Sequence, residues 1–209
     1  MLPYGEIPLS EWELLDTYLS ALAATPVHTL DRQEQYAFWL NLHNALVVRL
    51  IARAYLVLSV RDIDFGNGTP WDRPIVEVEG RPLSLSDIRN GILRAYWRDG
   101  RVHYGIFYGA VGSPGLLAQG FSGANVDRLL DEQALDFVNH PRGVWADGRS
   151  ANVSSLYKWY FEDFGGSRRA ILSHLRLYAL PGLRRMLPDN VALNYAFDWS
   201  LNDATGSLG

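Results

Sequence analysis

The feature that most constrains the fold is the stretch Asp31–Leu58, which predicts one long helix. Apolar residues between Phe38 and Tyr55 lie all the way round its helical wheel, a distribution typical of a helix buried on most faces. Asp31 and Glu34 form a capping-box pattern at its start, in which each carboxylate can accept from backbone donors of the first turn. The rest of the chain is therefore expected to pack around this helix.

One side of the predicted helix is polar. Glu34, Asn41 and Asn44 are spaced by seven and three residues, which places them on the same side. A buried amide without a hydrogen-bond partner costs about 1–3 kcal/mol, so the two asparagines need partners. Either they bond to the backbone of a neighbouring segment and fix its position, or they line a polar pocket.

Length and composition narrow the class of protein. A chain of 209 residues with 48% hydrophobic and 20% charged residues is long enough for one domain, expected over residues 1–209, with a sizeable core. A net charge of −4 argues against a general nucleic-acid binder, which usually has a basic face. The sequence has no cysteine, which excludes disulfides and thiolate nucleophiles.

The sequence predicts a soluble protein but leaves the compartment open. No charge-free apolar run is long enough to span a membrane, since the nearest, Ala45–Val60, contains Arg49 and Arg53. Met1–Ala24 lacks the basic start and apolar middle of a secretory signal. A signal removed before the numbering begins would make the protein extracytoplasmic.

Outside the central helix, the patterns predict an α+β fold: a mostly helical single domain with small antiparallel hairpins. Further helices are expected from Ser10, with Glu13 in a second capping box, to before Thr25, and over Asp87–Trp97, Ala124–Val138, Leu156–Phe164, Ser167–Tyr178 and Pro181–Leu187. Hairpins are expected for Ile75–Glu79 with Arg81–Leu83 and for Val144–Ala146 with Arg149–Val153, and a last strand over Val191–Tyr195. Asp64–Arg73 has the composition of a loop.

The segment Arg101–Ala110 is the best candidate for a strand, because β-branched and aromatic residues dominate it. In a strand, His103 and Tyr108 would point to opposite faces. The segment leads into the glycine-rich loop Gly109–Gly115, where backbone amides can approach a ligand.

Ser113 and His103 are the candidate catalytic residues. A relay of Ser113, His103 as base and Glu34 or Asn41 as orienting group would support hydrolysis or acyl transfer. The alternatives are a plain turn serine and a structural histidine, since Val111 stands where a nucleophile elbow has glycine.

No metal or cofactor is expected. The five histidines show no ligand spacing, and the glycine-rich loop has no following lysine of a phosphate-binding loop. The adjacent carboxylates Glu162 and Asp163 would point to different sides of a helix, so we expect them on a solvated face.

Six segments appear in an order that resembles a known family. They are EQYAFWLNLHNAL, PIVEVEGRPLSLSDIRNGIL, RVHYGIFYGAVGSPGLL, FVNHPRGV, LYKWYFEDFGG and FDWSLND. Together they resemble the family catalogued as domain of unknown function number 547, from about Trp12 to Asp203. The family has no assigned activity. Its members occur widely in bacteria, often exported, and as C-terminal domains of larger plant and animal proteins, which adds an extracytoplasmic alternative.

The chain departs from this family at two positions. Members usually carry a pattern like HFALNCAS-x-SCP, which places the histidine on His103, the two cysteines on Tyr108 and Ser113, and the proline on Pro114. Because both sulfurs are replaced, a cysteine-dependent activity does not carry over to this chain, and a structural pair of cysteines would simply be absent.

Three functional hypotheses follow. The first is a binding module or degenerate enzyme, with a polar pocket between the central helix and His103–Gly115 that takes an unknown small molecule or peptide; its binding residues would be Glu34, Asn41, Asn44 and Tyr108. The second is a serine-dependent hydrolase or acyl-transfer enzyme. The third is a scaffold domain without a ligand. The oligomeric state stays open.

Overall fold

The computed structural model of the chain describes residues 1–64 and 69–205. Its centre is helix α2, Arg32–Arg53, which is buried along most of its length. The predicted cap is present: the Asp31 side chain accepts hydrogen bonds from the backbone N–H groups of Gln33 and Glu34. The predicted end at Leu58 is wrong, because Leu56 has a φ of 90°, a left-handed conformation that a continuing helix excludes.

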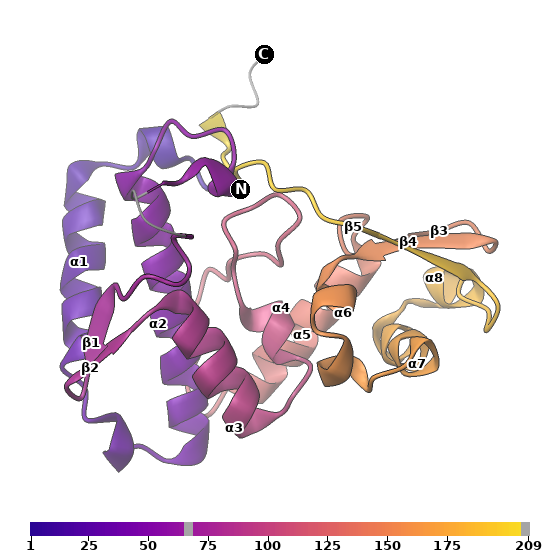
Figure 1. Cartoon of the computed structure of the whole chain (residues 1–209), viewed down its shortest axis with the longest axis horizontal. Coiled ribbons are helices and arrows are strands. Elements are labelled where there is room, and N and C mark those ends of the chain that lie inside the picture. Colours follow the sequence, from indigo (N-terminus) through magenta and orange to yellow (C-terminus); the bar gives the residue numbers. More distant parts are fainter. Residues whose placement is uncertain (65–68, 206–209) are drawn as a thin grey trace.

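Helix α1, Leu9–Ala23, packs along α2, and none of its residues is fully buried (Figure 1). The capping box predicted for Ser10 and Glu13 does not form, since the helix begins one residue earlier, after Pro8. Pro8 has the fixed φ and extended conformation of an entry to a helix, and α1 begins without a side-chain cap.

The hairpin and the helix that follow confirm the prediction. Strands β1, Val76–Val78, and β2, Arg81–Leu83, pair in antiparallel register. A π-helix over Asp87–Arg94 continues into α3, Ala95–Trp97. Ser84 caps this helix through reciprocal bonds with Asp87, from backbone N–H to side-chain oxygen in both directions. Of the predicted loop Asp64–Arg73, residues 65–68 lie outside the described residues.

The strand predicted over Arg101–Ala110 is wrong. The segment begins as a short helix, α4, Val102–Gly105, and continues as extended chain. Asp99 holds the start of α4, because its carboxylate accepts from the backbone N–H and the guanidinium of Arg101. All residues from 102 to 110 are buried, so the large apolar side chains reflect burial on every side and not the two faces of a sheet.

The C-terminal part alternates short helices with a three-stranded sheet. Its elements are α5 Val126–Asn139, β3 Val144–Ala146, β4 Ser150–Ser154, α6 Leu156–Trp159, α7 Arg168–Tyr178, α8 Pro181–Arg185 and β5 Ala192–Ala196. Strands β3 and β4 form the predicted antiparallel hairpin. Strand β5 pairs with β4 in parallel, with Ser150 opposite Ala192, after a crossover through the helices between them.

The end of the chain returns to its beginning. After β5 it runs back across the molecule toward the N-terminus (Figure 1). Three isolated bridges fix this return: Leu2 with Asp203, Ser59 with Ser200, and Ala110 with Leu201. The architecture is α+β around a long buried helix, and the last bridge places the C-terminal segment against the loop that carries Ser113.

Candidate functional site

The amide side of α2 holds the segments that pass beside it. Asn44 donates from Nδ2 to the carbonyl of Gly105 at 2.8 Å and accepts at Oδ1 from the N–H of Phe107 at 2.9 Å. Asn41 bonds to the backbone of Phe121 in the same way, through its carbonyl at 2.8 Å and its N–H at 2.9 Å. Both asparagines are therefore backbone anchors.

A groove opens beside the same amides. It has a volume of about 310 Å³ and is bounded by α1, α2, α4, Gln133 of α5 and the loop 115–121. We call it the amide groove. Tyr18 and Val48 provide apolar walls, and Asn41 and Asn44 lie along one side. None of the described residues that line it is acidic, basic or a histidine, so it favours an uncharged ligand.

Gln133 is the polar side chain of the amide groove that lacks a protein partner. It is 7% exposed, and its Oε1 makes no hydrogen bond within the described part of the chain. An unpaired buried carbonyl costs about 1–3 kcal/mol, which a ligand that donates an N–H or O–H would recover. The backbone of residues 116–119 likewise makes no hydrogen bond to any described residue, which leaves donors and acceptors on the rim.

His103 is held in a second polar arrangement, inside the core. Its Nε2 lies 2.7 Å from Oδ2 of Asp163, and its ring stacks on Tyr160 with centroids 3.9 Å apart. Burial lowers the pKa of His103, although the hydrogen bond to Asp163 opposes that shift. The imidazole is therefore neutral at pH 7, with Nε2–H donating to the carboxylate. Its Nδ1 is buried and has no described partner.

Asp163 is clamped from two sides. Arg94 donates to it as a fork, from Nε to Oδ2 at 2.5 Å and from Nη2 to Oδ1 at 3.0 Å. Burial alone would raise the pKa of Asp163, but the hydrogen bonds from His103 and Arg94 outweigh it and hold the pKa well below its usual value. The expected solvated position of Asp163 is wrong, because its side chain is only 22% exposed.

Ser113 and Tyr108 have partners of their own. The Ser113 hydroxyl donates to the carbonyl of Pro114 at 2.8 Å and accepts from the N–H of Tyr108 at 2.9 Å. The Tyr108 hydroxyl donates to that of Tyr160 at 3.3 Å. No hydrogen bond joins Ser113 to His103 within residues 1–64 and 69–205. The geometry of Ser113 is that of a turn residue and not of an activated nucleophile.

The predicted site residues thus divide into separate groups. Asn41 and Asn44 line the amide groove, whereas Glu34, Tyr108 and Ser113 do not. Glu34 lies instead against Gly123, where a Cβ atom would come within 2.7 Å of its Oε1. His103 does not line the amide groove either, so of the six expected site residues the structure brings only Asn41 and Asn44 to it.

Two functional candidates, Gln133 and Asp163, were missed in the sequence. Gln133 lies on the apolar side of α5 together with Val126, Leu130 and Phe137. A single amide among these core positions could have indicated it as a candidate. Asp163 follows a run of aromatic residues, but its partners are 60 and 69 residues away, and nothing local indicates them.

Neither a metal-binding cluster nor a membrane-spanning helix is present within the described ranges, 1–64 and 69–205. No group of three or more histidine, aspartate or glutamate side chains there is placed to hold a metal ion. No helix within those ranges has the length and apolar character needed to cross a bilayer.

The fold and the groove define the class: an α+β protein with an amide-bearing core helix and an uncharged groove beside it. The family model described as "Protein of unknown function, DUF547" matches residues 27–138, more than half of the chain, and the chain belongs to this family. The match covers α2, α4, the loop 115–121 and nearly all of α5, which together supply most of the groove. No curated protein and no solved structure matches the chain.

Proposed function

We propose that the chain is a binding module whose amide groove takes an uncharged small molecule or a short peptide segment. The observation that carries the proposal is the buried, unpaired Oε1 of Gln133 in a groove without charged walls. A volume of about 310 Å³ suits a small ligand or two to three peptide residues. Apolar walls on α1 and α2 would hold the body of the ligand, and Gln133 would orient it.

The backbone of residues 116–119 favours peptides among such ligands. This stretch is not part of a helix or strand, and its carbonyl and N–H groups have no described partner. An extended peptide can pair with a free backbone of this kind and place alternate side chains in the groove.

The histidine arrangement supports binding over catalysis. His103 and Asp163 have the pairing of a base and its orienting carboxylate, but neither the Ser113 hydroxyl, which was the expected nucleophile, nor the Tyr108 hydroxyl is bonded to His103. Burial also raises the pKa of Tyr108 well above its usual value, which makes its phenolate inaccessible near neutral pH. We therefore assign His103 to the core of a degenerate site.

A fragment screen by ligand-observed NMR, with neutral amides, alcohols and blocked dipeptides, tests the proposal. Val48→Trp should fill the groove and abolish binding, and Leu177→Trp, on the exposed face of α7, is the matched control. Gln133→Leu should weaken binding about tenfold without lowering the unfolding temperature, since it removes an unsatisfied buried oxygen. Binding that persists in Val48→Trp, or no binding at all, would refute the assignment.

A further inference from the structure

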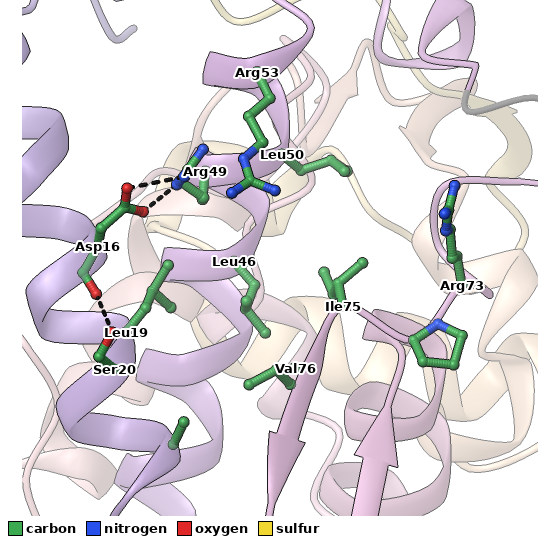
Figure 2. A pocket seen from close by; sticks show the side chains of 12 residues that line it. Asp16, Leu19, Ser20, Leu46, Arg49, Leu50, Arg53, Arg73, Ile75 and Val76 are labelled. Atoms are coloured by element: carbon green, nitrogen blue, oxygen red, sulfur yellow. Dashed lines mark hydrogen bonds and ion pairs between the residues drawn. The ribbon is translucent and has the colours of Figure 1, made fainter.

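A second hollow, larger than the amide groove, lies between α1, α2 and strand β1. Its volume is about 630 Å³. Figure 2 shows apolar side chains from three elements turned toward its interior, among them Leu19 of α1, Leu46 and Leu50 of α2, and Ile75 and Val76 at β1. We call this hollow the arginine pocket, for the residues that rim it.

The charge of the arginine pocket is opposite to that of the chain. Arg49, Arg53 and Arg73 line it together with one carboxylate, Asp16, in a protein of net charge −4. In Figure 2, Arg49 and Arg53 stand on α2 and Arg73 stands on the opposite side of the hollow. A cationic rim over an apolar floor is complementary to a molecule that has both an anionic group and an apolar part.

The two arginines on α2 have different roles. Arg49 is bound by Asp16 as a fork, through Nε to Oδ1 and through Nη2 to Oδ2 at 2.9 Å, so its charge is already compensated. Arg53, one helical turn further on, makes no hydrogen bond or ion pair with any residue of 1–64 or 69–205. Its guanidinium lies beside that of Arg49, toward the hollow. The charge of Arg53 acts on the carboxylate of Asp16 and helps to lower its pKa, but the planar set of donors of Arg53 is not hydrogen-bonded to any described residue and is available at the rim.

We propose that the arginine pocket binds an amphipathic anion: an aliphatic chain on the apolar floor, with a carboxylate or phosphate head group on Arg53. A guanidinium matches the two oxygens of either head group, and each buried methylene adds about 0.8 kcal/mol of favourable transfer free energy. The volume falls in the range of small-ligand sites. This site shares no lining residue with the amide groove.

Calorimetric titration with octanoate and octyl phosphate, each below its micelle concentration, tests this site. Saturable binding of at least one of the two anions is expected, and the tighter one identifies the head group. Arg53→Gln should weaken that binding about tenfold, the size of one charge-assisted hydrogen bond. Arg185→Gln, an exposed arginine on α8, should leave it unchanged.

Two further measurements separate a head-group effect from a change in the fold. Binding of 1-octanol should be equal in the wild type and in Arg53→Gln, because the tail contacts remain. Ala23→Trp should block all three ligands by filling the floor of the pocket. Failure of both anions to bind the wild type, or equal binding of the preferred anion to Arg53→Gln, would overturn the proposal. Neither result bears on the amide groove, whose test uses other variants and uncharged ligands.

Discussion

Replacing Asn44 with alanine removes two buried hydrogen bonds at once. The carbonyl of Gly105 and the N–H of Phe107 both lose their side-chain partner, and both residues are buried. Leaving one buried backbone group unpaired costs about 1–3 kcal/mol. For the two groups together, we expect the free energy of unfolding to fall by about 3–5 kcal/mol in Asn44→Ala.

Asn41→Ala is the matched comparison. It also removes two bonds to backbone, but Asn41 is only partly buried whereas Asn44 is 8% exposed, so water can replace the lost partner more readily at Asn41. We expect a loss of about 1–2 kcal/mol. Urea unfolding followed by tryptophan fluorescence measures both variants.

A difference of this size is also visible in thermal melts. For a domain near this length, each kcal/mol shifts the midpoint by about 2–4 °C, so Asn44→Ala should melt roughly 10 °C below the wild type. An Asn44→Ala variant within about 1 kcal/mol of the wild type, or no less stable than Asn41→Ala, would refute the anchoring role of this amide.

Three other perturbations test the polar groups Asp163, His43 and Ser113, of which His43 is a fully buried histidine of α2. Asp163→Asn should lower the free energy of unfolding by about 2–3 kcal/mol, because Arg94 loses its charged partner, whereas the neighbouring Glu162→Gln should stay within about 0.5 kcal/mol of the wild type. Burial lowers the pKa of His43 to about 3, so the contribution of the neutral His43 to stability is complete above pH 6.5. This contribution is lost as the pH falls toward 3, by about 1.4 kcal/mol per pH unit. The free energy of unfolding should therefore depend less steeply on pH in His43→Gln than in the wild type, and equal slopes would contradict this. Ser113→Ala should lower the free energy of unfolding by about 1–2 kcal/mol, because two hydrogen bonds of the hydroxyl are lost. A fluorophosphonate probe should not label Ser113. Labelling of the wild type that disappears in Ser113→Ala would instead support the serine mechanism.

The elements that sequence patterns predicted correctly are those fixed by neighbours in the chain. Asp31 caps α2 because the backbone N–H groups that donate to its carboxylate are only two and three residues away. The hairpins form because Gly80 and Gly148 adopt positive φ at their turns. In each case the decisive interaction is local, and the residue type alone indicates it.

The helix α4 shows where such patterns fail. Val102 and Tyr104 favour a strand by intrinsic preference, but no strand of the described residues pairs with them, and the carboxylate of Asp99 favours a turn of helix instead. Because the segment is buried against α2 and α5, it would carry large apolar side chains whether it formed a helix or a strand. Tertiary packing thus overrode local preference at the segment on which the predicted serine site depended.

The candidate site was predictable only in part. The spacing of Asn41 and Asn44 placed both amides on one side of α2, and the need for partners was clear from their burial. Which backbone they bind was not, because Gly105 and Phe121 lie 61 and 80 residues further along the chain. The arginine pocket could not be predicted either, because its residues are also far apart in the sequence. Without the positions of α1 and β1, the sequence pattern indicates only that Arg53 is a charged surface residue.

The side-chain amide resonance of Gln133 offers the most direct test of the amide groove. With ¹⁵N-labelled protein, a neutral fragment that binds should shift this resonance and leave that of Asn152, exposed on β4, in place. The shift should be absent in Val48→Trp. Fragments that bind while the Gln133 resonance stays unchanged would contradict the account of the groove as the binding site.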